Sequence, residues 1–277
     1  MLSILRCLRS FENLAQCIHV SPKTQKLTPH LYNYFKPQNR FIPTRFYSNQ
    51  NQKITKNAPE SLKYFDYSHI SLPGSPIDFS LDDFIILPKH FTHSEQEFLL
   101  NQSSKKLKRE FGKQVVYQED HFDGVIFGYR ECHASHWGED EDKVMEIFHK
   151  KVYNLFPEIT NWLPAHILDL SESGGIQAHI DHVEYSGNIV AGVCLSSSAV
   201  MFLRHQDNSQ FYFSVLLEPG CLYIQRDTIR YKFTHEIPVD QAEHMFKGEL
   251  IPKARRISLL FRNEYEDVHD EWVLGKI

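Results

Sequence analysis

The feature that most limits the possible folds is a series of short apolar runs that begins after Pro164. Each run has three to seven residues, and turn-forming residues separate it from the next. Short strands at this spacing are typical of a β-sandwich or barrel. The runs are Ile167–Leu170, Ile189–Leu195, Val200–Leu203, Phe211–Leu217, Leu222–Ile224, Tyr231–Phe233 and Ile257–Phe261. The turns between them include Ser173–Gly175, Ser186–Asn188, Asp207–Ser209 and Pro219–Gly220.

Two helices are expected before this β-rich part. Thr92 and Glu95 have the spacing of a capping box, and a helical stripe of apolar residues follows them. A second helix is predicted from about Asp140 to Phe156, because its apolar residues share one face and acidic residues fill its first turn. The expected fold class is therefore α+β, with N-terminal helices packed on an antiparallel β core.

The first 47 residues differ from the rest of the chain in charge. They hold seven Lys or Arg residues and one acid, Glu12, and apolar residues recur among them at helical spacing. A basic, amphipathic segment with nearly no acid is typical of a mitochondrial presequence. The pattern Arg-x-Tyr-Ser at 45–48 resembles the site used by the matrix processing peptidase. We therefore expect a mitochondrial matrix protein, and an ordinary basic tail is the alternative.

Four segments follow from these patterns. Residues 1–47 are predicted to be the presequence, the polar residues 48–78 a flexible linker, residues 79–265 the folded domain and residues 266–277 a C-terminal tail. No apolar run approaches the roughly 18–20 residues that a membrane span needs. The five cysteines form no CxxC pair, so we expect neither a zinc site nor a disulfide framework.

The charge of the chain after the presequence argues against general nucleic-acid binding. Without residues 1–47 it keeps 23 basic and 34 acidic residues, a formal net charge of −11. A protein that grips phosphates needs a basic surface. Duplex DNA is therefore an unexpected partner, although a local basic groove is compatible with this charge.

Three His-x-Asp tripeptides occur, at 121–123, 179–181 and 205–207. With 16 histidines in the chain, chance alone supplies such a tripeptide, so position must separate them. His179 and Asp181 lie beside a predicted strand, where residues two apart face the same side and can share an ion. His121 in an acidic loop and His205 at a predicted hairpin tip are expected to be solvated. His182 should point away from the ion and be structural.

A third ligand comes from His235, on the predicted strand 231–235, because an antiparallel barrel returns a later strand beside an earlier one. Two imidazoles and one carboxylate on one face of an octahedral ion form the facial triad of non-haem Fe(II) oxygenases. This set leaves three positions open. A 2-oxo acid can fill two of them by chelation, and O₂ can take the last.

The segment 256–262 predicts where such an acid binds. On a strand, Arg256, Ser258 and Arg262 share a face, and buried arginines are unfavourable without anions. Arginine also binds carboxylates through a planar, bidentate fork. We therefore assign Arg256, assisted by Ser258, to the distal carboxylate of 2-oxoglutarate, and we expect Arg262 nearer the metal-bound end. Pairing with internal Asp or Glu is the alternative.

Together these motifs resemble the AlkB family of Fe(II)- and 2-oxoglutarate-dependent dioxygenases. The family's signature is His-x-Asp, a distant His, and Arg-x₅-Arg that begins 21 residues after that His. Segments from HILDL (166–170) to IPKARRISLLFR (251–262) resemble its mitochondrial member, and the likeness covers roughly residues 80–264. It implies a double-stranded β-helix (jelly roll), with Fe(II) on His179, Asp181 and His235 and with 2-oxoglutarate and O₂ as co-substrates.

The resemblance adds Tyr223 to the 2-oxoglutarate site, beside Arg256, Ser258 and Arg262. From the residues alone, Tyr223 fits a core position as well as a binding site. The chain also departs from the family pattern. Members that repair nucleic acids have Asn-x-Tyr on the strand before His-x-Asp, whereas Leu168 and Leu170 stand here. Two hydrogen bonds to the co-substrate are therefore expected to be missing.

Three functions remain open at this stage. The first is hydroxylation of a mitochondrial protein, and the resemblance implies a regulatory role in fatty-acid metabolism and programmed necrosis. The second is demethylation of modified bases in mitochondrial RNA. The short, acidic segment 117–124 stands where repair enzymes carry an aromatic and basic lid, which disfavours duplex DNA but not single-stranded RNA. The third is a non-catalytic interaction protein, against which the complete triad counts.

Overall fold

The structure is a computed structural model that describes residues 54–67, 80–120 and 124–265. Within these residues, one antiparallel sheet has the strand order β1-β8-β7-β10-β5-β13-β6-β9-β2, with β4 beside β5 and β3 beside β4. The strands are β1 (Phe65–Asp66), β2 (Phe84–Leu87), β3 (Gln118–Asp120), β4 (Ile126–Ala134), β5 (Ala165–His179), β6 (Val190–Cys194), β7 (Ala199–His205), β8 (Asn208–Leu217), β9 (Leu222–Gln225), β10 (Phe233–Ile237) and β13 (Arg256–Arg262). A separate hairpin consists of β11 (Met245–Phe246) and β12 (Glu249–Leu250).

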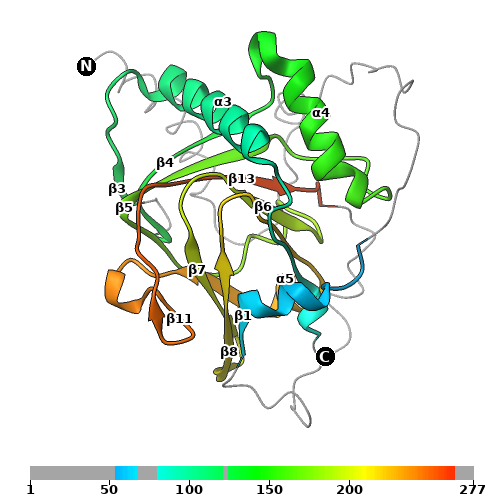
Figure 1. Cartoon of the computed structure of the whole chain (residues 1–277), viewed down its shortest axis with the longest axis vertical. Coiled ribbons are helices and arrows are strands. Elements are labelled where there is room, and N and C mark those ends of the chain that lie inside the picture. Colours follow the sequence, from blue (N-terminus) through cyan, green and yellow to red (C-terminus); the bar gives the residue numbers. More distant parts are fainter. Residues whose placement is uncertain (1–53, 68–79, 121–123, 266–277) are drawn as a thin grey trace, which may run out of the picture. The chain divides into compact units, whose positions relative to one another are not determined.

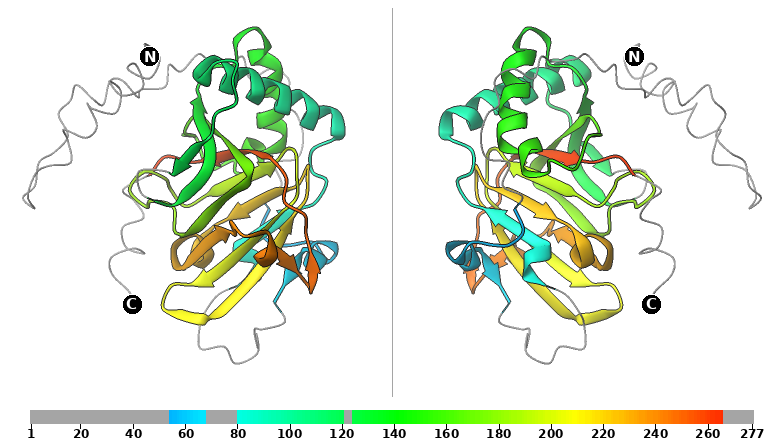
Figure 2. Two further views of the ribbon diagram at one scale, coloured as in Figure 1. Left: turned by 90° about the vertical axis from the view of Figure 1, so that its left-hand side faces the viewer. Right: turned by 90° about the vertical axis from the view of Figure 1, so that its right-hand side faces the viewer.

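The long strand β5 joins the two halves of the sheet. The strand β4 pairs with β5 from Ala165 to Ile176, whereas β13 pairs only with the first part, up to Leu170, and β10 with the last part, at Ile176 and His179. One half of the sheet is therefore β13-β6-β9-β2 and the other is β10-β7-β8-β1. The sheet curls so that these halves face each other (Figures 1 and 2). This curled antiparallel sheet with few helices confirms the predicted α+β class with a jelly-roll core.

Two apolar cores lie on opposite faces of the sheet. The outer core lies between the sheet and the helices α3 (His93–Phe111) and α4 (Glu141–Lys151), which both cover the same face (Figure 1). There the ring of Phe148 in α4 meets the ring of Phe261 in β13 edge-on at 4.8 Å between centroids. The inner core lies between the two halves of the curled sheet and includes Leu168, Leu170 and Tyr223. The candidate site residues face this inner side.

The predicted helices are present, with one end revised. The Oγ1 atom of Thr92 accepts the Glu95 amide at 3.3 Å, and the Glu95 carboxylate accepts the Thr92 amide at 2.8 Å, so α3 begins with the predicted capping box. The helix α4 ends at Lys151, and the 3₁₀ turn η4 (Tyr153–Leu155) continues the predicted span. The remaining short helices are η1 (Pro59–Tyr64), η2 (Leu81–Asp83), η3 (Gly138–Asp140), α5 (Asp227–Lys232) and η5 (Gln241–Glu243).

Two boundaries differ from the sequence prediction. Residues 59–66, which fall in the predicted linker, form η1 and β1, and Phe65 pairs with Val215 of β8 and is 1% exposed. The folded part thus begins before the predicted start near Phe79. Tyr231, predicted to lie in a strand, belongs to α5, and β10 begins only at Phe233. The predicted presequence and C-terminal tail lie outside the described residues.

The segment before the core contains more β structure than expected. Within the short acidic segment 117–124, residues 118–120 form β3, which pairs with β4, and β4 lies along β5. Residues 121–123 lie outside the described residues. None of the helices in the described part of the chain is long and apolar enough to cross a membrane.

Candidate active site

The structure brings His179, Asp181 and His235 together. His179 is the last residue of β5, Asp181 follows it, and His235 of β10 is the direct cross-strand neighbour of His179. The Oδ1 atom of Asp181 lies 3.3 Å from Nε2 of His179 and 3.8 Å from Nε2 of His235. Three ligand atoms, all within 4.8 Å of one another, therefore face a common point. This geometry can hold one metal ion.

The surroundings shift the pKa values of the two histidines in opposite directions. The Nδ1 atom of His179 lies 2.9 Å from the carbonyl oxygen of Gln177 and donates to it, which leaves Nε2 free as a ligand. Burial, together with the nearby His179, lowers the pKa of His235 to about 3, so this ring is neutral at physiological pH. Burial lowers the pKa of His179, but Asp181 outweighs that effect and the net shift is upward.

Arg262 binds the second carboxylate oxygen of Asp181, Oδ2. Its Nε atom donates to Oδ2 of Asp181 at 2.7 Å. Burial alone would raise the pKa of Asp181, but Arg262 and the two histidines hold that pKa well below its ordinary value. Asp181 is therefore ionised, with Oδ1 turned to the histidines. From the sequence, we expect Arg262 near the metal-bound end of 2-oxoglutarate. In the structure, its Nε atom contacts the carboxylate of Asp181.

A second contact of Arg262 leads away from the triad. Its Nη1 atom donates to Nδ1 of His166 at 3.1 Å, so the proton of His166 must lie on Nε2. That Nε2 atom lies 2.9 Å from the carboxylate of Glu131 on β4. The ring of His133 stacks on His166 at 4.5 Å between centroids. His166 and Glu131 were not predicted, because their contacts join strands that are distant in the sequence.

Arg256 is a buried cation with an incomplete set of partners. It is 4% exposed, and its Nη1 atom donates to Oγ of Ser258 at 3.1 Å. Among the described residues, its Nε and Nη2 atoms are buried without a hydrogen-bond partner, although the Cys194 thiol lies close to the guanidinium. A buried donor without a partner is unfavourable by about 1–3 kcal/mol. The two unpaired nitrogens are neighbours in the guanidinium fork, a geometry that matches the two oxygens of a carboxylate.

The surroundings of Arg256 are apolar on one side and aromatic on the other. Leu170 pairs with Arg256 and Leu168 with Ser258, and both leucines are 2% exposed. Tyr223 of β9 lies near Arg256 and Arg262, and burial raises the pKa of its phenol to about 12. A Cβ atom on Gly192 would lie 2.3 Å from the Tyr223 ring, so only glycine lets the ring lie across β6.

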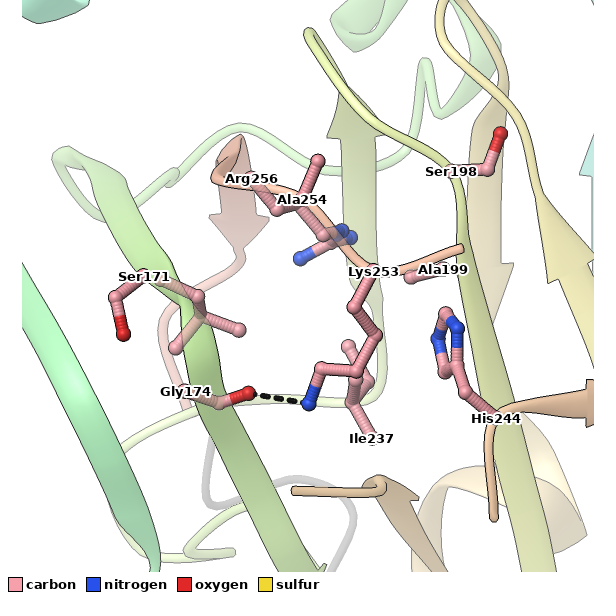
Figure 3. Close-up of a pocket in the computed structure, with 10 residues that line it drawn as sticks. Ser171, Gly174, Ser198, Ala199, Ile237, His244, Lys253, Ala254 and Arg256 are labelled. Carbon is pink, nitrogen blue, oxygen red and sulfur yellow. Dashed lines mark hydrogen bonds between the residues drawn. The ribbon is translucent and has the colours of Figure 1, made fainter. Parts of the chain in front are cut away.

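Two cationic side chains, Lys253 and Arg256, line a pocket at this end of the inner face, and they differ in their hydrogen bonds. Lys253 donates from Nζ to the carbonyl oxygens of Gly174, Pro238 and Val239 at 2.5–2.7 Å, as Figure 3 shows for Gly174. Arg256 lines the same pocket but keeps two donors free. Of the two cations, Lys253 is therefore satisfied by main-chain oxygens, whereas Arg256 is not.

The other His-x-Asp histidines lie elsewhere. His205 was expected to be solvated, but it ends β7, is 9% exposed and packs edge-on against Phe233 at 5.2 Å between ring centroids. Its position in a strand, rather than at the hairpin tip, explains the error. His182 is exposed, and its Nδ1 atom accepts the Glu184 amide at 3.3 Å, as a structural residue would. His121 lies outside the described residues.

Comparisons with known sequences agree with this site. A profile described as "2OG-Fe(II) oxygenase superfamily" matches residues 158–262, a range that contains the triad and both arginines. The mouse (Mus musculus) protein "Alpha-ketoglutarate-dependent dioxygenase alkB homolog 7, mitochondrial" is 33% identical over 182 residues, which are 66% of this chain and 79% of the mouse protein. The protein of the same name from Bos taurus is 34% identical over 182 residues, with the same shares.

Solved structures with a partly similar arrangement have low sequence identity. One, described as "The structure of OsALKBH1", has a TM-score of 0.49 and 14% identity, over 65% of this chain and 98% of that one. A prolyl hydroxylase from Trichoplax adhaerens, in complex with a peptide fragment of hypoxia inducible factor, has a TM-score of 0.48 and 13% identity. That match covers 70% of this chain and 88% of the hydroxylase.

Proposed function

Because the chain belongs to the AlkB family of 2OG-Fe(II) oxygenases, we propose that it acts in mitochondria as a dioxygenase that hydroxylates a protein substrate. The class of reaction follows from the family: a 2-oxoglutarate-dependent dioxygenase uses Fe(II), 2-oxoglutarate and O₂. The mitochondrial location rests on the names of its relatives and on the basic segment 1–47, and the matrix is the compartment that segment predicts.

His179, Asp181 and His235 would hold the iron. Two neutral imidazole nitrogens and one carboxylate oxygen are the donors that non-haem Fe(II) takes. Gln177 fixes the ring of His179, and Arg262 keeps Asp181 ionised and turned towards the histidines. The bound iron and 2-oxoglutarate supply the activation of O₂, with conversion of 2-oxoglutarate to succinate and CO₂.

Arg256, Ser258 and Tyr223 would bind the far end of 2-oxoglutarate. The free Nε and Nη2 atoms of Arg256 would take the distal carboxylate, while Ser258 fixes the third nitrogen of its fork. Arg262 has one nitrogen, Nη2, that is not used by its contacts with Asp181 and His166 and could reach the acid nearer the metal. Leu168 and Leu170 exclude water from this pocket but offer it no hydrogen bond.

The observation that best supports this assignment is the incomplete hydrogen bonding of Arg256. A buried guanidinium with two unpaired nitrogens lies on the same inner face as the metal triad, and the strands β13 and β5 bring both there. A structural arginine would have its donors satisfied within the chain. The free donors therefore support an anionic ligand at this position.

The choice of a protein substrate rests on charge. The chain after residue 47 has a formal net charge of −11, and the loop that follows Asp181 exposes Glu184 and Tyr185. Such a surface repels phosphates and favours a neutral or basic polypeptide. A regulatory role in fatty-acid metabolism and programmed necrosis belongs to the same proposal and rests on the family resemblance alone.

Mass spectrometry of mitochondrial proteins and RNA tests the substrate class. We would compare cells that carry the chain, cells that lack it and cells that carry His179→Ala. The expected result is a polypeptide that loses the mass of one oxygen atom in the last two, with unchanged methylated bases. Methylated bases that accumulate in the last two, with an unchanged protein profile, would reject protein hydroxylation in favour of RNA demethylation.

A further inference from the structure

One arginine outside the predicted site holds the loop that carries Asp181. Arg230 lies in α5 and is 2% exposed. Its Nη1 atom donates to the main-chain oxygen of Asp181 at 2.9 Å, and its Nε atom donates to that of Gly187 at 3.2 Å. Its Nη2 atom donates to the main-chain oxygen and to Oγ of Ser186 at 3.2 and 2.9 Å. All four bonds therefore end on residues 181–187.

This use of a buried arginine is specific. All four acceptors are neutral oxygen atoms, so the guanidinium acts through its geometry more than through a paired charge. Its planar fork reaches three residues of one loop at once, which a lysine ammonium, as a single point, cannot reproduce. A charged group buried with several hydrogen bonds loses much when those bonds are removed.

Asp181 is thus held at both ends. Arg262 of β13 binds Oδ2 of the side chain, and Arg230 of α5 binds the main-chain oxygen of the same residue. The atom left over is Oδ1, which lies near Nε2 of both triad histidines. Because the two arginines come from different elements, the direction of Oδ1 is set before any ion arrives.

We propose that Arg230 is a positioning residue for the metal, which it serves by fixing the main chain of Asp181. This inference rests on the proposed function, in which Asp181 is a ligand. Partners of metal ligands are known to contribute about 10–100-fold to metal affinity. Arg230 would contribute in this way through the backbone, without touching the ion or the ligand's carboxylate.

The chain offers a matched control in Arg226, four residues earlier at the start of the same helix. Arg226 also donates to main-chain oxygens, those of Ile54, Thr55 and Asp82, but these lie on the N-terminal segments and not on the metal loop. A lysine at either position removes an arginine fork from α5. The two variants therefore differ in which segment loses its support.

Binding of Mn(II) to the full chain, followed by electron paramagnetic resonance of the free ion, tests the proposal without turnover. We expect Arg230→Lys to weaken Mn(II) binding by about tenfold, while Arg226→Lys leaves it unchanged despite a comparable loss of thermal stability. Ser186→Ala removes one acceptor of Arg230 and the bond from Ser186 Oγ to the His182 carbonyl oxygen, and it should give a smaller loss in a protein that keeps the arginine. This milder variant carries the test if Arg230→Lys does not fold.

The outcomes separate the two claims. Unchanged Mn(II) affinity in Arg230→Lys and Ser186→Ala, or equal losses in the two lysine variants, would overturn the role of Arg230 alone. Wild-type protein that binds no Mn(II), or an Asp181→Ala variant that binds it as well as the wild type does, would overturn the proposed metal site itself.

Discussion

Asp169 and Arg256 are buried charges on opposite faces of two paired strands, and their surroundings differ sharply. Asp169 is fully buried on the outer face of β5, where Arg130, Arg255 and Tyr117 all donate to its carboxylate. Arg256 is buried on the inner face of β13, where Nη1 donates to Ser258 and the other two nitrogens have no hydrogen-bond partner among the described residues. The chain supplies the partners of Asp169 by itself, whereas the unpaired nitrogens of Arg256 would be available to the ligand that we propose.

The difference has an energetic meaning. A buried carboxylate whose hydrogen bonds are complete supports the fold, although replacing a whole buried ion pair by apolar groups is often neutral. Each buried donor without a partner instead costs about 1–3 kcal/mol. The inner face is therefore less stable than it could be, and a bound dicarboxylate would remove that deficit.

The largest expected effect is on the outer face. Asp169→Asn leaves the buried Arg130 without its counter-charge, so we expect the free energy of unfolding to fall by about 3–5 kcal/mol. Denaturant unfolding measures this. The affinity of the folded protein for 2-oxoglutarate should be unchanged. Glu97→Gln, at an exposed pair with His93, is the control and should leave the stability unchanged. An Asp169→Asn protein as stable as the wild type would remove one side of the comparison.

The next largest effect is on the inner face, where we expect a loss of 2-oxoglutarate affinity without a loss of stability. Arg256→Met should weaken 2-oxoglutarate binding by about two orders of magnitude, since removing one partner of a buried charge pair costs about 2–5 kcal/mol. The unfolding free energy without ligand should stay the same or rise. Calorimetric titration of the Mn(II)-loaded chain measures the affinity.

Arg255→Met is the matched control for this variant, because Arg255 is the adjacent residue but points to Asp169. It should lose stability and keep its affinity for 2-oxoglutarate. An Arg256→Met protein that binds 2-oxoglutarate like the wild type, or that is destabilised as much as Asp169→Asn, would show that Arg256 is a structural charge and not a ligand-binding one.

The two faces of β13 were predictable from the sequence, but their partners were not. A strand has a period of two, so Arg256, Ser258 and Arg262 had to share a side. Whether the charged side chains on a face find all their hydrogen-bond partners within the chain depends on residues that are distant in the sequence. Asp169 is 39 positions from Arg130 and 86 from Arg255, and such pairings leave no local pattern.

The prediction for β5 was wrong for a related reason. Ser173–Gly175 was expected to be a turn, yet these residues lie inside the strand. A Cβ atom on Gly174 would lie 2.6 Å from the carbonyl oxygen of Gly128. Glycine is therefore required there by the close approach of β4, and a sequence alone does not distinguish that requirement from a turn.

The smallest expected effect concerns pH, and His244, which lines the same pocket as Arg256, reports it. Its Nε2 atom accepts the Val200 amide at 2.8 Å, and its Nδ1 atom donates to the Ile251 carbonyl at 2.7 Å. Burial, opposed by the bond to Ile251 and aided by Lys253 and Arg256, lowers its pKa below 6.5. The folded ring is therefore neutral where the unfolded ring takes up a proton.

The stability that depends on this ring is complete above pH 6.5 and declines as the pH falls below it. The decline is at most about 1.4 kcal/mol per pH unit for one proton. His244→Gln should give a shallower decline of unfolding free energy between pH 7.5 and 5.5 than the wild type, and the exposed His93→Gln should not. Equal slopes in all three proteins would show that the buried ring does not contribute.

We propose that the inner face holds iron on His179, Asp181 and His235 for a reaction of 2-oxoglutarate. Succinate formation from 2-oxoglutarate by the pure chain, with and without Fe(II), tests it most directly. We expect succinate that depends on Fe(II), background levels in His179→Ala, and wild-type levels in His182→Ala, which changes an exposed histidine of the adjoining loop. Succinate formed equally by His179→Ala and the wild type, or by neither, would contradict it.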